Sequence, residues 1–169
     1  MALEAGPAMR LERPRRRHAV QKAREFAEVY STPPIPVLEI AQSHGLNVVL
    51  SEFGRFAEGV SGALSFKDKR LYVNRFDSPQ RKRFTIAHEF GHWILHKPFF
   101  DADPELYAVL PRYSQPDVSN PFEQEANAFA AELLVPQHLL KQVSGAGPAT
   151  LAQLFGVSRA MMEVRLRSV

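Results

Sequence analysis

The stretch FTIAHEFGHWILH, residues 84–96, places His88 and His92 four residues apart and puts a glutamate directly after the first histidine. On an α-helix the two rings share one face about 6 Å apart along the axis, close enough to bind one zinc ion. Glu89 lies about 100° further round the helix, where it can take a proton from a water beside the ion. The spacing predicts a metal site with its own base. The alternative is a packed helix whose histidines only make hydrogen bonds.

A third histidine, His96, lies four residues after His92 but is not a third metal ligand. His96 lies roughly 12 Å along the helix axis from His88, too far for both to bind one ion. We therefore interpret His96 as a residue that supports the site or the fold. Because a catalytic zinc site needs three protein ligands and an open position for water, the third ligand must come from another element.

The helix expected to begin at Asn120 offers two glutamates as the third ligand. Counted at about 100° per residue, Glu123 lies about 60° from the centre of the apolar face and Glu125 about 100°, which favours Glu123. Glu123 also fits a capping box, because it lies three residues after Asn120. Asn127, one turn further on, is expected to hydrogen-bond a ligand histidine.

The segments before the histidine helix predict helices followed by a small sheet. Two helices are expected first, in residues 15–30 and 37–45. Three strands are expected next, in residues 46–53, 60–66 and 70–76. The last two strands form a hairpin. Ser78 and Pro79 then start the histidine helix, which we expect to end at His96. Residues 97–121 are rich in proline and read mostly as a loop.

The predicted fold class is α+β, with a small three-stranded sheet packed on helices. Residues 1–14 show little pattern and are expected to be mobile. Residues 15–140 form the main domain. Residues 147–169 are predicted to add two helices packed on it, joined by a turn at Gly156, with Ser158 capping the second.

The composition excludes several classes of protein. The 169 residues are 45% hydrophobic, enough for one globular unit with a core. Because the chain contains no cysteine, a transition metal must be held by His, Asp or Glu. The lack of cysteine also fits a reducing cytoplasm. No apolar run approaches the roughly 20 residues that span a bilayer. The arginines near the N-terminus read as a solvated face.

Two segments, RKRFTIAHEFGHWILH and FEQEANAFAAELLVP, together resemble the ImmA/IrrE family of zinc metallopeptidases. The similarity extends from the N-terminal helices to Pro136, and the tail is similar to the helix-turn-helix-like end of that family. The resemblance implies that residues 15–140 form a zincin-like metallopeptidase domain. In that family the third zinc ligand is the glutamate of an E-x-x-A-N pattern, which falls here on Glu123, Ala126 and Asn127.

The resemblance also implies a function. It predicts a zinc-dependent endopeptidase that cleaves a helix-turn-helix transcriptional repressor and so relieves repression in a stress response, a mobile element or a toxin–antitoxin system. We expect His88, His92 and Glu123 to hold Zn²⁺ and Glu89 to act as the base.

Two further features are candidates for handling the substrate. Tyr72 and His96 are candidates to stabilise the oxyanion, although Tyr72 also fits a packing position in its strand. The strand in residues 70–76 is expected to pair with an extended substrate at the sheet edge.

The C-terminal segment supports a second class of function. Its helix, glycine turn and capped helix are typical of a DNA-binding unit, in which Arg159, Arg165 and Arg167 can contact phosphates. The apolar residues of the same segment also fit packing on the main domain, which we favour. A non-catalytic antitoxin-like partner or a DNA-binding regulatory module is the alternative to an enzyme.

Overall fold

The computed structural model describes residues 11–56, 59–105, 109–113, 119–143 and 145–169. The predicted mobility of residues 1–14 falls mainly on residues outside this description. Within the described residues, no helix is both long enough and apolar enough to cross a membrane.

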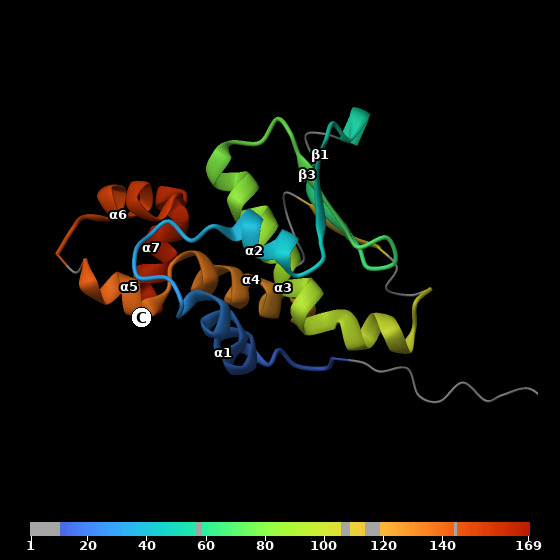
Figure 1. The fold of residues 1–169 in the computed structure, drawn as a ribbon, viewed down its shortest axis with the longest axis horizontal. Coiled ribbons are helices and arrows are strands. Elements are labelled where there is room, and N and C mark those ends of the chain that lie inside the picture. Colours follow the sequence, from blue (N-terminus) through green and yellow to red (C-terminus); the bar gives the residue numbers. More distant parts are fainter. Residues whose placement is uncertain (1–10, 57–58, 106–108, 114–118, 144) are drawn as a thin grey trace, which may run out of the picture.

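The described chain is mixed α+β, as predicted (Figure 1). Its α-helices are α1 (Arg16–Ala27), α2 (Val37–Ser43), α3 (Pro79–Ala102), α4 (Pro121–Leu134), α5 (Gln137–Gln142), α6 (Pro148–Phe155) and α7 (Arg159–Arg167). A short 3-10 helix, η1, covers Gly54–Phe56. Several predicted caps are present: the side chains of Ser78, Asn120 and Ser158 each accept a hydrogen bond from the backbone of the helix that follows.

The sheet contains one strand more than predicted. Its strands are β1 (Asn47–Ser51), β2 (Val60–Ser65), β3 (Arg70–Asn74) and β4 (Val109–Tyr113). The predicted hairpin of β2 and β3 is confirmed, and β4 pairs with β2 on the other side. We expected residues 97–121 to be mostly loop because of their prolines. Proline is compatible with an edge strand, and β4 is such a strand.

The prediction that residues 70–76 offer a free edge to the substrate is wrong. The strand order is β1-β3-β2-β4, so β3 is paired on both sides, in parallel with β1 and antiparallel with β2. An extended peptide needs an unpaired row of backbone groups. In the described sheet only β1 and β4 lie at the edges.

Helix α3 does not end at His96 but continues through Pro98 to Ala102. Proline removes one backbone hydrogen bond, so its presence predicted an end here. The extra turn buries Phe99 and stacks Phe100 on Phe66, with ring centroids 5.2 Å apart. Aromatic packing of this kind offsets the missing backbone bond.

The helices and the sheet share one core. Figure 1 shows the sheet at one end of the molecule and α5, α6 and α7 at the other, with α3 and α4 running between them. The core cluster includes residues of every α-helix and of the sheet. In the C-terminal helices, Leu151, Phe155 and Met162 are at most 3% exposed. The apolar face of α6 and α7 is therefore buried against the rest of the chain.

One of the arginines proposed to contact phosphates is buried. Arg165 is 8% exposed, and its guanidinium donates to the Glu132 carboxylate and to the Val135 carbonyl. An arginine paired inside the protein is not free to bind a DNA backbone. For Arg165 the structure agrees with packing, which we favoured, and not with the alternative of a phosphate contact.

At Gly62 the strand β2 lies very close to β3 and α3. A Cβ added there would lie 2.5 Å from Cγ2 of Thr85 and 2.7 Å from the backbone oxygen of Tyr72. We expect Gly62→Ala to lower the free energy of unfolding by about 1–3 kcal/mol, because a carbonyl oxygen cannot move aside as a side chain can. Chemical denaturation measures this effect.

Gly147→Ala is the matched control for Gly62→Ala. No atom lies within 4 Å of the added Cβ, and the φ of Gly147 is −71°, which alanine also adopts. Gly147→Ala should therefore change the free energy of unfolding by less than about 1 kcal/mol. Equal effects of the two substitutions would show that β2 does not pack on α3 as tightly as described.

Candidate metal centre

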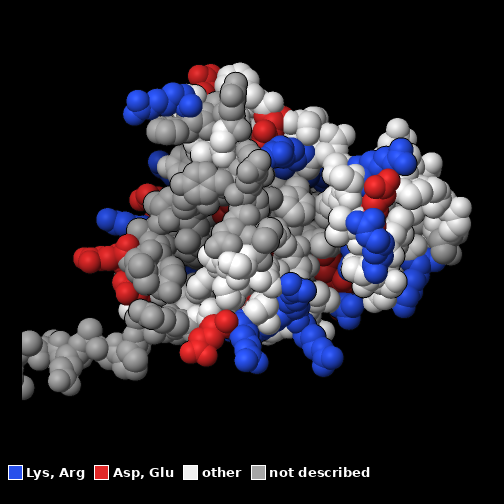
Figure 2. All heavy atoms as spheres, turned by 180° about the vertical axis from the view of Figure 1, so that it is seen from behind, with Lys and Arg blue, Asp and Glu red and all other residues white. Residues whose placement is uncertain are grey.

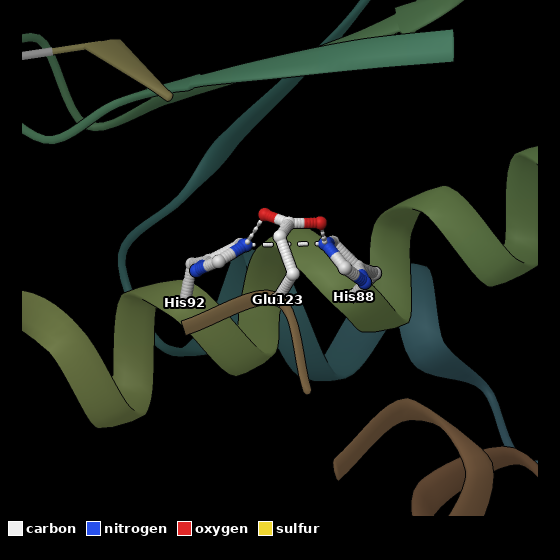
Figure 3. A group of neighbouring side chains, drawn as sticks. All are labelled: His88, His92 and Glu123. Atoms are coloured by element: carbon white, nitrogen blue, oxygen red, sulfur yellow. Dashed lines mark hydrogen bonds and ion pairs between the residues drawn. The ribbon is translucent and has the colours of Figure 1, made fainter. Parts of the chain in front are cut away.

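Three side chains from two helices meet between α3 and α4. His88 and His92 lie one turn apart on α3, and Glu123 reaches them from the first turn of α4 (Figure 3). The two Nε2 atoms are 3.1 Å apart, and the Glu123 oxygens lie 3.2 Å from Nε2 of His88 and 3.0 Å from Nε2 of His92. One ligand atom from each residue lies within 4.8 Å of the others. A single ion can contact all three.

The Glu123 carboxyl is held in its charged form. Burial raises the pKa of this carboxyl, but the close approach of Nε2 of His88 and Nε2 of His92 outweighs burial and holds the pKa below its ordinary value. Both carboxylate oxygens lie next to the histidines, so Glu123 does not act as the capping-box glutamate that the sequence also allowed. The side chain of Asn120 caps α4 instead, by accepting from the backbone N–H of Phe122.

Asn127 orients the ring of His88. Its Oδ1 lies 2.9 Å from Nδ1 of His88, as expected for this asparagine. An amide oxygen only accepts, so Nδ1 of His88 carries the hydrogen. The lone pair of Nε2 is then directed toward His92 and Glu123, which is the form of histidine that binds metals.

His96 lies behind His92 and contacts it from the side away from Glu123. Its Nδ1 is 2.8 Å from Nδ1 of His92, and its Nε2 is 3.0 Å from Oε2 of Glu125. Burial lowers the pKa of His96 to about 4, so the ring is neutral near pH 7. Both ring nitrogens are engaged, which is the arrangement of a supporting residue and leaves neither nitrogen to stabilise an oxyanion.

Glu125 has a different position from the one that its angle on the helix indicated. We placed Glu123 nearer the apolar face, yet Glu125 is 0% exposed and is the more deeply buried of the two. Burial raises the pKa of the Glu125 carboxyl, but hydrogen bonds from His96 and Arg15 lower it to about 2. Glu125 is therefore an ionised carboxylate inside the protein, with partners on both sides.

Arg15 was missed by the sequence analysis. It donates to Glu125 through its backbone N–H at 2.5 Å, through Nε at 2.9 Å and through Nη2 at 3.0 Å. The two residues are 110 positions apart. Arg15 belongs to a run of basic residues that resembles an ordinary solvated face, so no local signal distinguishes it.

Two further candidates from the sequence are Glu89 and Tyr72. Glu89 follows His88 on α3 and is 1% exposed. Tyr72 is half-buried in β3, in register with Val49 and Ala63. The role of Tyr72 in stabilising the oxyanion stays a prediction.

A cavity of about 640 Å³ lies beside the cluster, between the start of α3, α4 and α7. Phe84 and Asn127 line it, and both approach His88: the ring centroids of Phe84 and His88 are 6.1 Å apart. On the far side the cavity reaches Val164, which is 59% exposed. Of the residues named for the metal centre, Asn127 lines this cavity, and His88, His92 and Glu123 do not.

The donor set fits a divalent metal such as zinc. Two neutral imidazole nitrogens and one carboxylate are common zinc ligands, and three protein ligands leave a position for water or substrate. Asn127 and His96 hold the two rings from outside, as is usual for histidines that bind metals. Such a site can polarise a carbonyl and activate a water molecule.

Comparisons with known proteins agree with this chemistry. The chain is 29% identical over 108 residues to the radiation response metalloprotease IrrE of Deinococcus radiodurans, a match that covers 63% of this chain and 29% of that protein. A solved structure, described as a Mycobacterium tuberculosis transcriptional regulator, has a similar fold with a TM-score of 0.62 at 18% identity. That similarity covers 88% of this chain and 46% of the other. Residues 41–167 match the family described as the IrrE N-terminal-like domain. The chain therefore belongs to this family of metallopeptidases.

Proposed function

We propose that the chain is a zinc-dependent, site-specific endopeptidase. The observation that carries the proposal is the convergence of His88, His92 and Glu123, with Glu89 next to His88 on the same helix. When bound by these three ligands, zinc supplies a Lewis acid that polarises the scissile carbonyl and lowers the pKa of a water molecule. Family membership supports a metal in this position.

The protein's own residues supply the remaining steps. Glu89 accepts the proton of the attacking water on its carboxylate and later donates it to the leaving amine. Asn127 and His96 keep the two histidine rings turned toward the ion. Both histidines are buried, and electrostatic interactions are stronger in a buried site than at the surface.

We further propose that the substrate is a helix-turn-helix transcriptional repressor, whose cleavage relieves repression. This part rests on the resemblance to the ImmA/IrrE family. A relative is named a radiation response metalloprotease, in agreement with a regulatory role, although the chain matches only 29% of its length. The cut is expected in an extended segment, because the carbonyl of a formed helix is already hydrogen-bonded within that helix.

The alternative of a DNA-binding module is less well supported. The apolar face of α6 and α7 is buried, and Arg165 is paired with Glu132. On the face shown in Figure 2, the described Lys and Arg side chains are spread over several places, with Asp and Glu among them. DNA-binding surfaces normally gather their basic residues on one face.

Incubation of the zinc-loaded protein with candidate repressors and with an unrelated unfolded protein tests the proposal. We expect one or a few cuts in a repressor, located by mass spectrometry, and none in the unfolded control. Equal digestion of both would contradict site specificity. Intact repressors under every metal condition, together with salt-dependent DNA binding that survives zinc removal, would favour the binding module.

A further inference from the structure

A row of four side chains leads from the metal centre to the surface at the start of α1. His92 contacts His96 at 2.8 Å, and His96 contacts Glu125 at 3.0 Å. Glu125 is held in turn by Nε and Nη2 of Arg15, at 2.9 and 3.0 Å. The side chains of His96 and Glu125 are at most 2% exposed, whereas that of Arg15 is 42% exposed. The row therefore joins a buried metal ligand to a surface arginine.

The chemistry of the two ends sets the direction of every hydrogen bond in this row. Arginine only donates, and Glu125 accepts from the backbone N–H, Nε and Nη2 of Arg15, so Glu125 also faces Nε2 of His96 as an acceptor and that nitrogen carries the hydrogen. Nδ1 of His96 and Nδ1 of His92 face each other, so one donates and the other accepts. With its one hydrogen on Nε2, the neutral ring of His96 accepts here through the lone pair of Nδ1, and His92 donates. His92 is left with a lone pair on Nε2, the atom that faces His88 and Glu123. This is the tautomer that binds a metal.

An imidazole by itself does not impose such a direction. If His96 donated from Nδ1, His92 would have to accept there and would carry its hydrogen on Nε2, which blocks a metal. Asn127 excludes this reversal for His88 in one step, because its oxygen only accepts. For His92 the same constraint comes from Glu125, two hydrogen bonds away.

We infer that His96, Glu125 and Arg15 are positioning residues that hold His92 in its metal-binding tautomer. This inference rests on the proposed function, because it takes His92 as a metal ligand. Arg15 lies outside residues 41–167, the part of the chain that matches the family. Its guanidinium carbon also lies 5.7 Å from the centre of the Phe99 ring, on the last turn of α3. A residue outside the family-matched segment thus completes the support of the metal centre.

The zinc affinities of Arg15→Met, Glu125→Gln and a control variant, each made in the full chain, test this role. We expect Arg15→Met and Glu125→Gln to weaken zinc binding by about 10- to 100-fold, measured by competition with a chelator. Glutamine can donate as well as accept, so it no longer imposes the direction of the row.

Arg24→Met is the matched control for Arg15→Met. Arg24 also lies at α1, is 39% exposed in its side chain, and pairs with a buried glutamate of α4, Glu132. Its partner does not contact a ligand histidine in any described hydrogen bond, so zinc affinity should stay within about twofold of the wild type. If Arg24→Met weakens zinc binding as much as Arg15→Met, the effect is one of helix packing and the inference is wrong.

Nitrogen-15 NMR of the zinc-loaded wild type provides a readout that packing alone does not change. We expect the hydrogen on Nδ1 of His92 and on Nε2 of His96, with no hydrogen on Nδ1 of His96. A hydrogen on Nδ1 of His96, or unchanged zinc affinity in both Arg15→Met and Glu125→Gln, would overturn the inference. If the protein binds zinc but cuts no repressor, the proposal of a repressor as substrate is wrong, and this inference is unaffected. A wild type that binds no zinc would overturn both.

Discussion

Glu89→Gln is expected to keep its zinc and its fold while losing peptide hydrolysis by about 10²- to 10⁴-fold. The two side chains have the same shape, so a buried position tolerates the change sterically. An amide nitrogen, however, cannot accept the proton of the attacking water, nor can the amide return a proton to the leaving amine. The loss should therefore appear in the rate of cleavage and not in metal content.

Three measurements on the Glu89→Gln protein distinguish this outcome from unfolding. Metal analysis should give about one zinc per chain, circular dichroism should match the wild type, and kcat/KM for repressor cleavage should fall. A variant that still turns over at the wild-type rate would remove Glu89 from the role of base. A variant without zinc would show that Glu89 supports the metal centre itself.

Glu123→Ala is expected to empty the metal site, as are His88→Ala and His92→Ala. Each change removes one of three ligands, and no other described residue joins this group. Zinc affinity should fall further in these variants than in a variant of a supporting residue such as Glu125, for which we expect a loss of about 10- to 100-fold. Chelator competition on the purified variants gives these affinities directly.

Gln124→Ala is the control for the ligand variants. Gln124 lies between the two glutamates on α4, and its side chain contacts Arg16 and the Ser119 carbonyl at the surface. Its removal should leave zinc affinity unchanged. If Glu125→Ala empties the site and Glu123→Ala does not, the two glutamates have been assigned the wrong roles.

The ranking of these variants depends on how the two glutamates differ, and this difference was only partly predictable. The angular argument chose Glu123 as ligand because it placed that residue nearer the apolar face. The structure supports Glu123 as the ligand for another reason: its oxygens reach both histidines, while the more deeply buried Glu125 is turned toward His96 and Arg15. A helical angle measures direction around one axis and contains no information about which neighbour lies there.

The order of the strands in the sheet was also only partly predictable from the sequence. The hairpin of β2 and β3 was predictable, because its two strands are joined by a short turn. Insertion of β3 between β1 and β2 was not, because the parallel pairing of β1 with β3 skips over β2 in the sequence. That pairing moved the expected substrate edge away from β3.

The chain by itself was enough to predict the histidine pair, its glutamate, the hydrogen bond that Asn127 accepts from a histidine and most helix starts. These features depend on residues at most a few positions apart within one helix, whose geometry is the same in every protein, or on a family pattern that can be read directly from the chain. The continuation of α3 past Pro98, the addition of β4 and the bond from Arg15 to Glu125 depended on contacts between distant segments. Aromatic packing offsets the bond lost at Pro98, and β4 has its partner only where β2 lies beside it. The bond from Arg15 forms because an ionised carboxylate away from water must find a partner wherever the chain can supply one.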